Sequence, residues 1–210
     1  MRDLMGIRNK FMLYAFIMVS SCVKQVPNYQ TQLENYNKDE VDIFIENSTK
    51  NQSLTSLKEI GSVQYRLNYV PNDVEALKRT DYEKMNNDSI ENYINEFRSN
   101  YKGVYFFTLY ISNKSGEDCI KLLASENRSY EDLIKYCSFG INNDFYAVKG
   151  NDTLACIAAN FERTYGLSKD IRFNLSFRGD KTMADNKVND LSLVYEDNLF
   201  KNGIIKFRFD

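Results

Sequence analysis

The sequence predicts a mainly β protein, an antiparallel β-sandwich with a few short helices. Residues 63–69 alternate apolar and polar side chains, and residues 171–177 and 205–209 repeat this alternation. A period of two is typical of a strand with one face against a core and the other in water. Residues 104–111 are apolar or aromatic on both faces except for Thr108, which predicts a central strand covered on both sides.

Turn residues separate several of these strands. Residues 145–148 and 153–161 flank the sequence Lys-Gly-Asn-Asp. Because Gly and Asn tolerate positive φ angles, this segment predicts a β-hairpin. Residues 191–195 alternate less regularly and predict a further strand, and Asn202 with Gly203 predicts a turn before the last one.

Short helices interrupt the strands. Residues 90–99 carry apolar side chains at helical spacing, with Asp88 or Ser89 as the expected N-cap. Ser129 followed by Asp132 resembles a capping box before a helix that reaches Tyr136. A helical turn is predicted over 72–79. Residues 33–47 partly fit a helix and residues 41–45 also fit a strand; we favour the helix.

About seven to nine short strands with brief helices favour a sandwich, with an immunoglobulin-like topology as one option. The chain has no Trp, and the paired cysteines of antibody domains are absent, so only the architecture is predicted. The length of 210 residues fits one domain with a tail.

Charge and composition exclude several functions. The chain has 27 Lys and Arg against 29 Asp and Glu, and no His. The chain therefore lacks the excess of basic residues that is typical of nucleic-acid-binding proteins. The missing His removes Ser-His-Asp and Cys-His catalysis and every His-ligated metal site. We therefore expect no enzyme, no metal and no cofactor.

The amino terminus has the zones of a secretory signal. Residues 1–10 carry three basic residues and one acidic residue, and residues 11–19 are apolar or aromatic without a charge. Nine residues make about 14 Å of helix. A bilayer core is about 30 Å thick, so this segment is too short for a transmembrane anchor.

The residues Val19, Ser20, Ser21 and Cys22 resemble the lipobox of bacterial lipoproteins. The resemblance implies recognition of Val19, Ser20 and Ser21 by a dedicated signal peptidase. It also implies a diacylglyceryl group on the Cys22 sulfur and acylation, for example with palmitate, of the new amino terminus. The predicted organisation is a signal peptide over 1–21, a lipidated Cys22 with a tether over 22–32, and one β-rich domain over 33–210 with a helical lead-in over about 33–50.

Cleavage leaves 24 basic and 28 acidic residues, a mildly acidic body that favours the lipid as the membrane anchor. Val23 differs from the Asp that marks inner-membrane retention in some bacteria, and the first acidic residue after Cys22 is Glu34. By this analogy we expect a place in the outer membrane facing the periplasm, in preference to surface display.

Four further segments, 150–156, 161–167, 193–197 and 203–207, resemble a group of uncharacterised envelope lipoproteins. The resemblance implies a shared fold and no known activity, so it transfers no site residue.

The remaining candidate residues favour structural roles. Cys119, Cys137 and Cys156 are an odd number of thiols without a C-x-x-C pair, and their redox state is left open, with reduced and buried favoured. The 15 Tyr and 14 Phe are assigned mainly to the core. Residues 178–190 are interpreted as a solvated loop, and no spacing selects a catalytic carboxylate pair.

Two functions follow from these observations. The first is a lipid-anchored envelope protein with a non-catalytic domain that has an accessory role and binds an envelope protein. The alternative is a domain that binds a glycan or a peptide or, less favoured, hydrolyses one.

Overall fold

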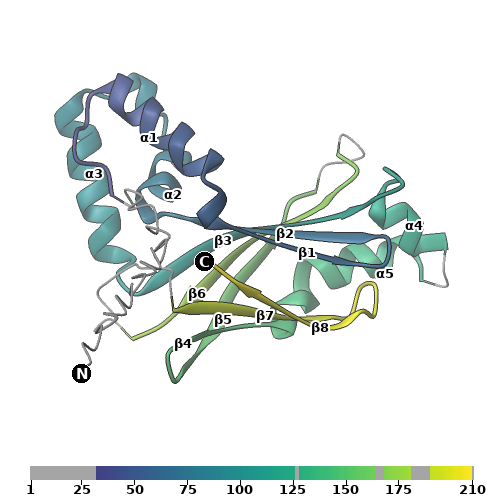
Figure 1. Cartoon of the computed structure of the whole chain (residues 1–210). Helices are drawn as coiled ribbons and strands as arrows, with labels where there is room; N and C mark the ends of the chain where they lie inside the picture. Colours follow the sequence, from purple (N-terminus) through teal and green to yellow (C-terminus); the bar gives the residue numbers. More distant parts are fainter. Residues whose placement is uncertain (1–31, 126–127, 164–167, 181–189, 210) are drawn as a thin grey trace, which may run out of the picture.

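A computed structural model describes residues 32–125, 128–163, 168–180 and 190–209. The predicted signal peptide, Cys22 and the tether lie outside these residues, except for Gln32 at the end of the tether. The described part is a strongly curved antiparallel sheet with two groups of helices (Figure 1). Its eight strands are β1 Thr55–Ile60, β2 Val63–Val70, β3 Val104–Asn113, β4 Phe145–Lys149, β5 Asp152–Phe161, β6 Ile171–Arg178, β7 Leu191–Asp197 and β8 Gly203–Arg208.

Hydrogen bonds join the strands in the order β1-β2-β3-β6-β5-β4-β7-β8, and every neighbouring pair is antiparallel. The edge strands β1 and β8 approach each other, so the sheet curls almost into a barrel. The prediction of a mainly antiparallel β protein with short helices is confirmed. A two-sheet sandwich, and an immunoglobulin-like topology in particular, is not confirmed, because the described strands form one continuous sheet.

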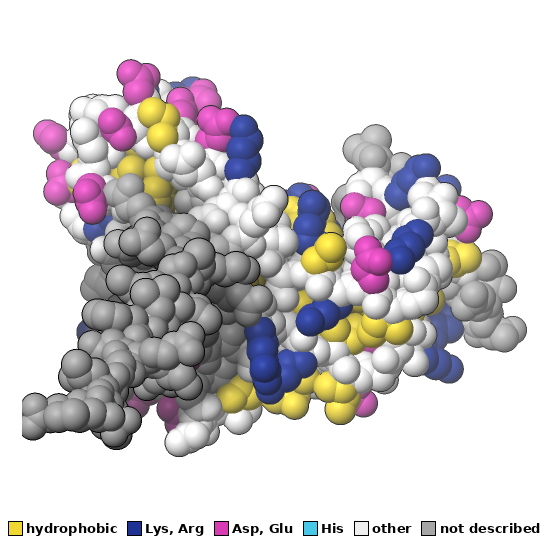
Figure 2. Space-filling model, viewed as in Figure 1, with side chains coloured by type: hydrophobic (Ala, Val, Ile, Leu, Met, Phe, Trp, Pro, Cys, Tyr) yellow, Lys and Arg dark blue, Asp and Glu magenta, His cyan; other side chains and the backbone are white. Residues whose placement is uncertain are grey.

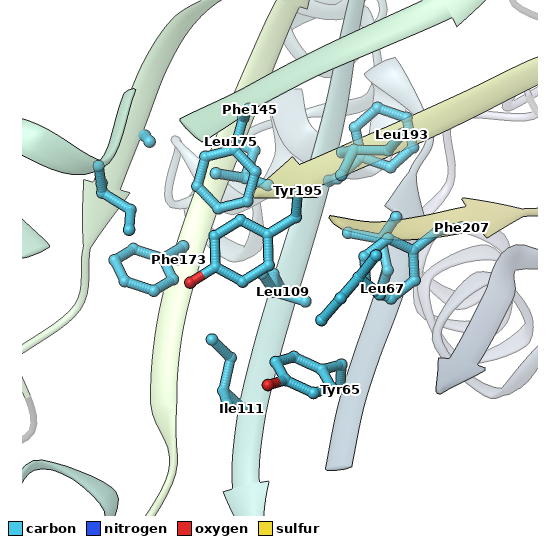
Figure 3. Close-up of a cluster of buried hydrophobic side chains, with 14 of the residues drawn as sticks. Tyr65, Leu67, Leu109, Ile111, Phe145, Phe173, Leu175, Leu193, Tyr195 and Phe207 are labelled. Carbon is cyan, nitrogen blue, oxygen red and sulfur yellow. The ribbon is translucent and has the colours of Figure 1, made fainter. Parts of the chain in front are cut away.

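The concave side of the sheet holds the main core (Figure 3). Side chains from strands far apart in the sequence point toward one another there, including Tyr65 of β2, Phe173 of β6 and Phe207 of β8. Rings of Phe145 and Tyr195 stack with centroids 4.6 Å apart. The apolar positions of the period-two segments therefore face inward, which confirms the predicted strand phases and the assignment of most aromatics to the core.

Two groups of helices cover the sheet in different ways. Helices α4 Cys119–Ser125 and α5 Tyr130–Lys135, with the π-helical turn Tyr136–Gly140 and the 3-10 turn Ile141–Asp144, add buried side chains to the main core. Helices α1 Lys38–Lys50, α2 Asn72–Lys78 and α3 Asn87–Asn100 form a helical unit with its own apolar cluster on the outer face of β2 and β3. The 3-10 turns Gln52–Leu54 and Tyr82–Lys84 complete the described elements.

The predicted helices are present, with one correction. The segment at 33–47 is helical only from Lys38, where α1 begins, because Asn37 is its N-cap. Ser129 caps α5 by accepting a hydrogen bond from the Asp132 amide at 3.0 Å. The N-cap of α3 is Asn86, so the prediction of Asp88 or Ser89 was wrong. Asn86 Oδ1 accepts from the Ser89 amide at 2.8 Å, which satisfies a free donor of the first turn from a position two or three residues earlier than expected. Strand β1 and helix α4 were not predicted.

The turn before β3 requires a glycine for two separate reasons. Gly103 has φ +75°, and a Cβ at this position would lie 2.8 Å from the Asp180 carbonyl oxygen. Gly61 also has a positive φ, +60°, but a Cβ at this position would have no atom within 4 Å. Substitution of Gly61 therefore measures the backbone strain without a steric clash. We expect Gly61→Ala to cost about 1 kcal/mol of unfolding free energy and Gly103→Ala roughly 3 kcal/mol, measured by urea denaturation. Equal losses would show that the Asp180 carbonyl moves aside freely.

Candidate functional site

The described domain begins at a buried ion pair. Asp73, at the start of α2, is 1% exposed, and Arg98 of α3 donates to both of its carboxylate oxygens at 2.8 and 2.6 Å. The Leu33 amide donates to the same carboxylate at 2.7 Å, and the Leu33 carbonyl accepts from Arg98 at 3.0 Å. The hydrogen bond with Asp73 raises the pKa of Arg98. This arrangement, the Leu33 clamp, fixes the place where the chain from the predicted tether joins the domain.

Several apolar side chains are exposed on β4, β5 and β8 and on the π-helical turn Tyr136–Gly140, away from the Leu33 clamp. Tyr146 of β4 is 42% exposed and its strand partner Ala155 of β5 is also exposed. A β-bulge in β5 makes Ile157 an extra residue, 44% exposed, and the adjacent turn carries Phe139 with 82% exposure. Ile204 of β8, 72% exposed, lies at the same end of the sheet. We call Phe139, Tyr146, Ala155, Ile157 and Ile204 the apolar face.

Charged side chains border the apolar face. Glu196 of β7 is exposed and pairs in register with Ile204, while Val194 pairs with Tyr146 on one side and with exposed Lys206 on the other. Figure 2 shows hydrophobic side chains (yellow) beside basic ones (dark blue) over the lower half of the sheet. Figure 1 draws β4, β5, β7 and β8 in this region, away from the α1–α3 unit. An aromatic centre with a charged border is the composition of a protein-binding surface.

The carboxylates at the ends of β5 and β7 lie in different surroundings. Glu162 forms an ion pair with Arg172 at 3.0 Å. Glu196 is exposed on the outer side of β7. Asp197 is 2% exposed and accepts hydrogen bonds from the hydroxyls of Tyr65 at 2.5 Å and Tyr195 at 3.0 Å. The structure therefore does not bring these three side chains together as a set of catalytic carboxylates.

Asp197 organises the turn between β7 and β8. Its side chain also accepts from the amides of Leu199 at 3.2 Å and Phe200 at 3.1 Å. Desolvation and the hydrogen bond to Asp197 raise the pKa of the Tyr65 hydroxyl. Desolvation and the Asp197 charge likewise raise the pKa of Tyr195. Both hydroxyls consequently stay protonated donors, which stabilises the buried carboxylate.

The three described cysteines are free thiols in the main core or against it. Cys119 and Cys137 are buried and Cys156 is half-buried. Desolvation raises the pKa of Cys119 and of Cys137 to about 12, and that of Cys156 to about 11. Because the thiolate is the reactive form, raised values make these thiols poor nucleophiles at neutral pH.

We expect all three thiols to resist alkylation by iodoacetamide at pH 8 in the folded protein, with Cys156 the fastest of them. After unfolding in guanidinium chloride, each should react within minutes, because its pKa returns toward the ordinary value near 8.5. Peptide mass mapping after a timed pulse measures this order. Rapid labelling of Cys119 or Cys137 in the folded protein would contradict their burial in the core.

Two further properties concern the described residues as a set. They contain no group of three or more acidic, Cys or His side chains placed to hold a metal ion. Among the described helices, none has the length and apolar character needed to cross a bilayer. The predicted site residues Val19, Ser20, Ser21 and Cys22 lie outside the described part.

Sequence reasoning missed Tyr146 and the Leu33 clamp. Tyr146 is at a position of the predicted strand 145–148 whose side chain faces away from the core. An aromatic residue at such a position could have indicated an exposed apolar surface. Asp73 and Arg98 are 25 residues apart in the sequence, and no local pattern joins them to each other or to Leu33.

Comparison with known proteins assigns no family. No protein-family model matches the chain, and no curated protein matches it. Among solved structures, the chain is similar to a novel protein of unknown function from Burkholderia pseudomallei K96243, with 18% sequence identity and a TM-score of 0.33. The match covers 74% of this chain and 78% of that chain. A similarity at this level carries no argument about fold or function.

Proposed function

We propose that this protein is a lipid-anchored component of the bacterial cell envelope whose domain acts by binding another envelope protein. The single observation that supports protein binding best is the apolar face, which leaves Phe139, Tyr146, Ile157 and Ile204 exposed on one end of a sheet. Exposed aromatic and branched side chains inside a charged border favour a partner protein as the occupant.

The proposed anchor places this domain close to a membrane. The tether from Cys22 to Gln32 has a root-mean-square reach of roughly 17 Å when flexible. The Leu33 clamp then joins this tether to α2 and α3, on the helical unit, while the apolar face lies on β4, β5 and β8. The docking surface and the attachment point are thus on different elements, so that anchoring leaves the surface free for a partner.

Site-specific photo-cross-linking in the native bacterium tests the proposal. A benzoylphenylalanine in place of Tyr146 should give a discrete adduct with one envelope protein, and the adduct should disappear when Ile157→Asp is added to the same chain. A charged side chain in the centre of a desolvated contact is strongly unfavourable, which predicts at least about a tenfold loss of adduct.

Leu57 of β1 provides the matched control. Its side chain is 51% exposed, close to the 42% of Tyr146, but it lies outside the apolar face. The same photoreactive residue at Leu57 should give no adduct with that partner. Equal adducts from both positions, or an adduct that survives Ile157→Asp, would reject docking through the apolar face.

A further inference from the structure

A separate groove lies between the helical unit and the outer face of the sheet. It has a volume of about 260 Å³, and its lining includes Arg66 and Asn68 of β2, Thr108 and Tyr110 of β3, and Lys78 at the end of α2. No Asp or Glu is among the described residues that line it. The groove shares no residue with the apolar face, so ligand binding there does not depend on the proposed function.

Strand register places an arginine on each side of Tyr110, whose side chain lines the groove. Tyr110 is the partner of Arg66 on one side and of Arg172 on the other. The Arg66 guanidinium carbon lies 4.4 Å from the Tyr110 ring centroid, and that of Arg172 lies 5.1 Å from it. Stacking against the ring holds both guanidinium groups in place without using their N–H donors.

The two cations that line the groove have no ion-pair partner among the described residues. Arg172 is paired with Glu162, and Glu75 is paired with Arg79 at 2.8 Å, so the nearby acids are already engaged. Desolvation lowers the pKa of Lys78, the charges of Glu75 and Glu162 raise it, and the charge of Arg172 lowers it. An anion in the groove would offset both of these unfavourable effects on the Lys78 ammonium.

Neutral polar groups complete the lining. Asn68 Oδ1 accepts a hydrogen bond from the Thr55 hydroxyl at 3.3 Å, which leaves the Asn68 amide N–H donors for another partner. Thr108 is 5% exposed and donates to Asn174 at 3.2 Å, so that its oxygen remains an acceptor. A stacked guanidinium, an ammonium, an amide donor and a hydroxyl in a groove whose described lining has no carboxylate match an anionic group that also carries hydrogen-bonding atoms.

The neighbouring helices carry the opposite charge. Segments 33–50 and 71–100, which contain α1, α2 and α3, carry twelve acidic and six basic residues. Figure 2 shows magenta side chains across the exposed surface of this unit. The groove is therefore a cationic recess beside an acidic surface, which directs a small anion to one place.

We propose that the groove lined by Arg66, Lys78, Asn68 and Tyr110 binds a small polar ligand that bears a carboxylate or a phosphate group, with an acidic sugar as the representative class. Arg66 and Lys78 contact the anionic group, and Asn68 with Thr108 bonds to adjacent hydroxyls. The volume of the groove accommodates one such residue rather than a polymer.

Calorimetric titration of the purified intact protein at low salt tests this site. The probes are glucuronate, glucose 6-phosphate and glucose, which present a carboxylate, a phosphate and no charge on one sugar frame. We expect saturable binding of at least one acidic sugar and no binding of glucose at the same concentrations. The stronger acidic sugar identifies the preferred group.

Variants separate the groove from general charge effects. Arg66→Gln and Lys78→Gln should each raise Kd roughly tenfold or more, since each removes a charge-assisted hydrogen bond. Lys135→Gln removes the same charge from an exposed position on α5 and should leave Kd unchanged. Lys78 is exposed, so its variant keeps the test valid if Arg66→Gln perturbs folding. Absence of binding by both acids, binding of glucose with equal affinity, or equal losses in Lys135→Gln would overturn the proposal.

Discussion

Replacing Cys22 with Ala should move the protein from the membrane fraction to the soluble fraction and abolish its labelling by an alkyne-tagged fatty acid. The expected change is nearly complete because the proposed anchor depends on one sulfur atom. With the multiple acyl chains that the lipobox implies, anchoring is stable, whereas a single chain gives only marginal binding. The body expected after the predicted cleavage has 24 basic and 28 acidic residues, so electrostatic attraction to an anionic leaflet would not replace the proposed lipid.

Ser21→Thr offers a control that changes the same segment but keeps the thiol and a small side chain, and most of the labelling should remain. The mass of the purified mature protein provides an independent measurement, because a lipidated chain that begins at Cys22 is heavier than its amino acids alone. Equal labelling of the wild type and of Cys22→Ala would reject the lipoprotein assignment, and the binding role of the apolar face would then need another location.

Asp73→Ala should strongly lower the folding stability of the domain. The change removes the carboxylate that holds both Arg98 and the Leu33 amide, and it leaves a partly buried guanidinium, 24% exposed, without its acid. We expect a loss of about 3 kcal/mol in the free energy of unfolding, measured by urea denaturation. Asp73→Asn should lose less, because an amide oxygen still accepts a hydrogen bond.

Asp81→Ala is the matched control. Asp81 forms an ion pair with Lys84 at 2.6 Å, but the two side chains are 57% and 84% exposed. Water and salt screen such a pair, so its loss should change stability by less than about 1 kcal/mol. If Asp73→Ala were as mild as Asp81→Ala, the Leu33 clamp would not be a strong attachment of the chain to the domain.

Local patterns in the sequence predicted most of the secondary structure. The alternation at 63–69 and 171–177, the turn residues around Gly150 and the spacing of Ile90, Ile94 and Phe97 correspond to β2, β6, the β4–β5 hairpin and α3. Strand β1 was missed because it is an edge strand, and three adjacent residues, Leu57 to Glu59, are exposed. Its burial pattern therefore lacks the regular alternation on which the prediction depended.

The candidate sites were less accessible to prediction. Arg66 and Tyr110 line the groove and Arg172 packs against the Tyr110 ring, and these residues belong to three strands separated by 44 and 62 positions in the sequence. Each one looked like an ordinary outward residue of its own strand. Tyr146 and Ile157 likewise become neighbours only because β4 pairs with β5, and β5 carries a bulge in its register with β6.

The sequence alone determined most of the strands, the apolar face of each of these strands and where most helices lie, because these properties depend on residues within a few positions of one another. It also supplied the prediction of lipid attachment at Cys22. Only the tertiary structure decided that β3 pairs with β6 to make one curled sheet, that Asp73 meets Leu33 and Arg98, and that Arg66 and Lys78 line one groove. Pairing between distant strands is selected by the packing of the whole core, and the energy of that packing is not a property of any single segment.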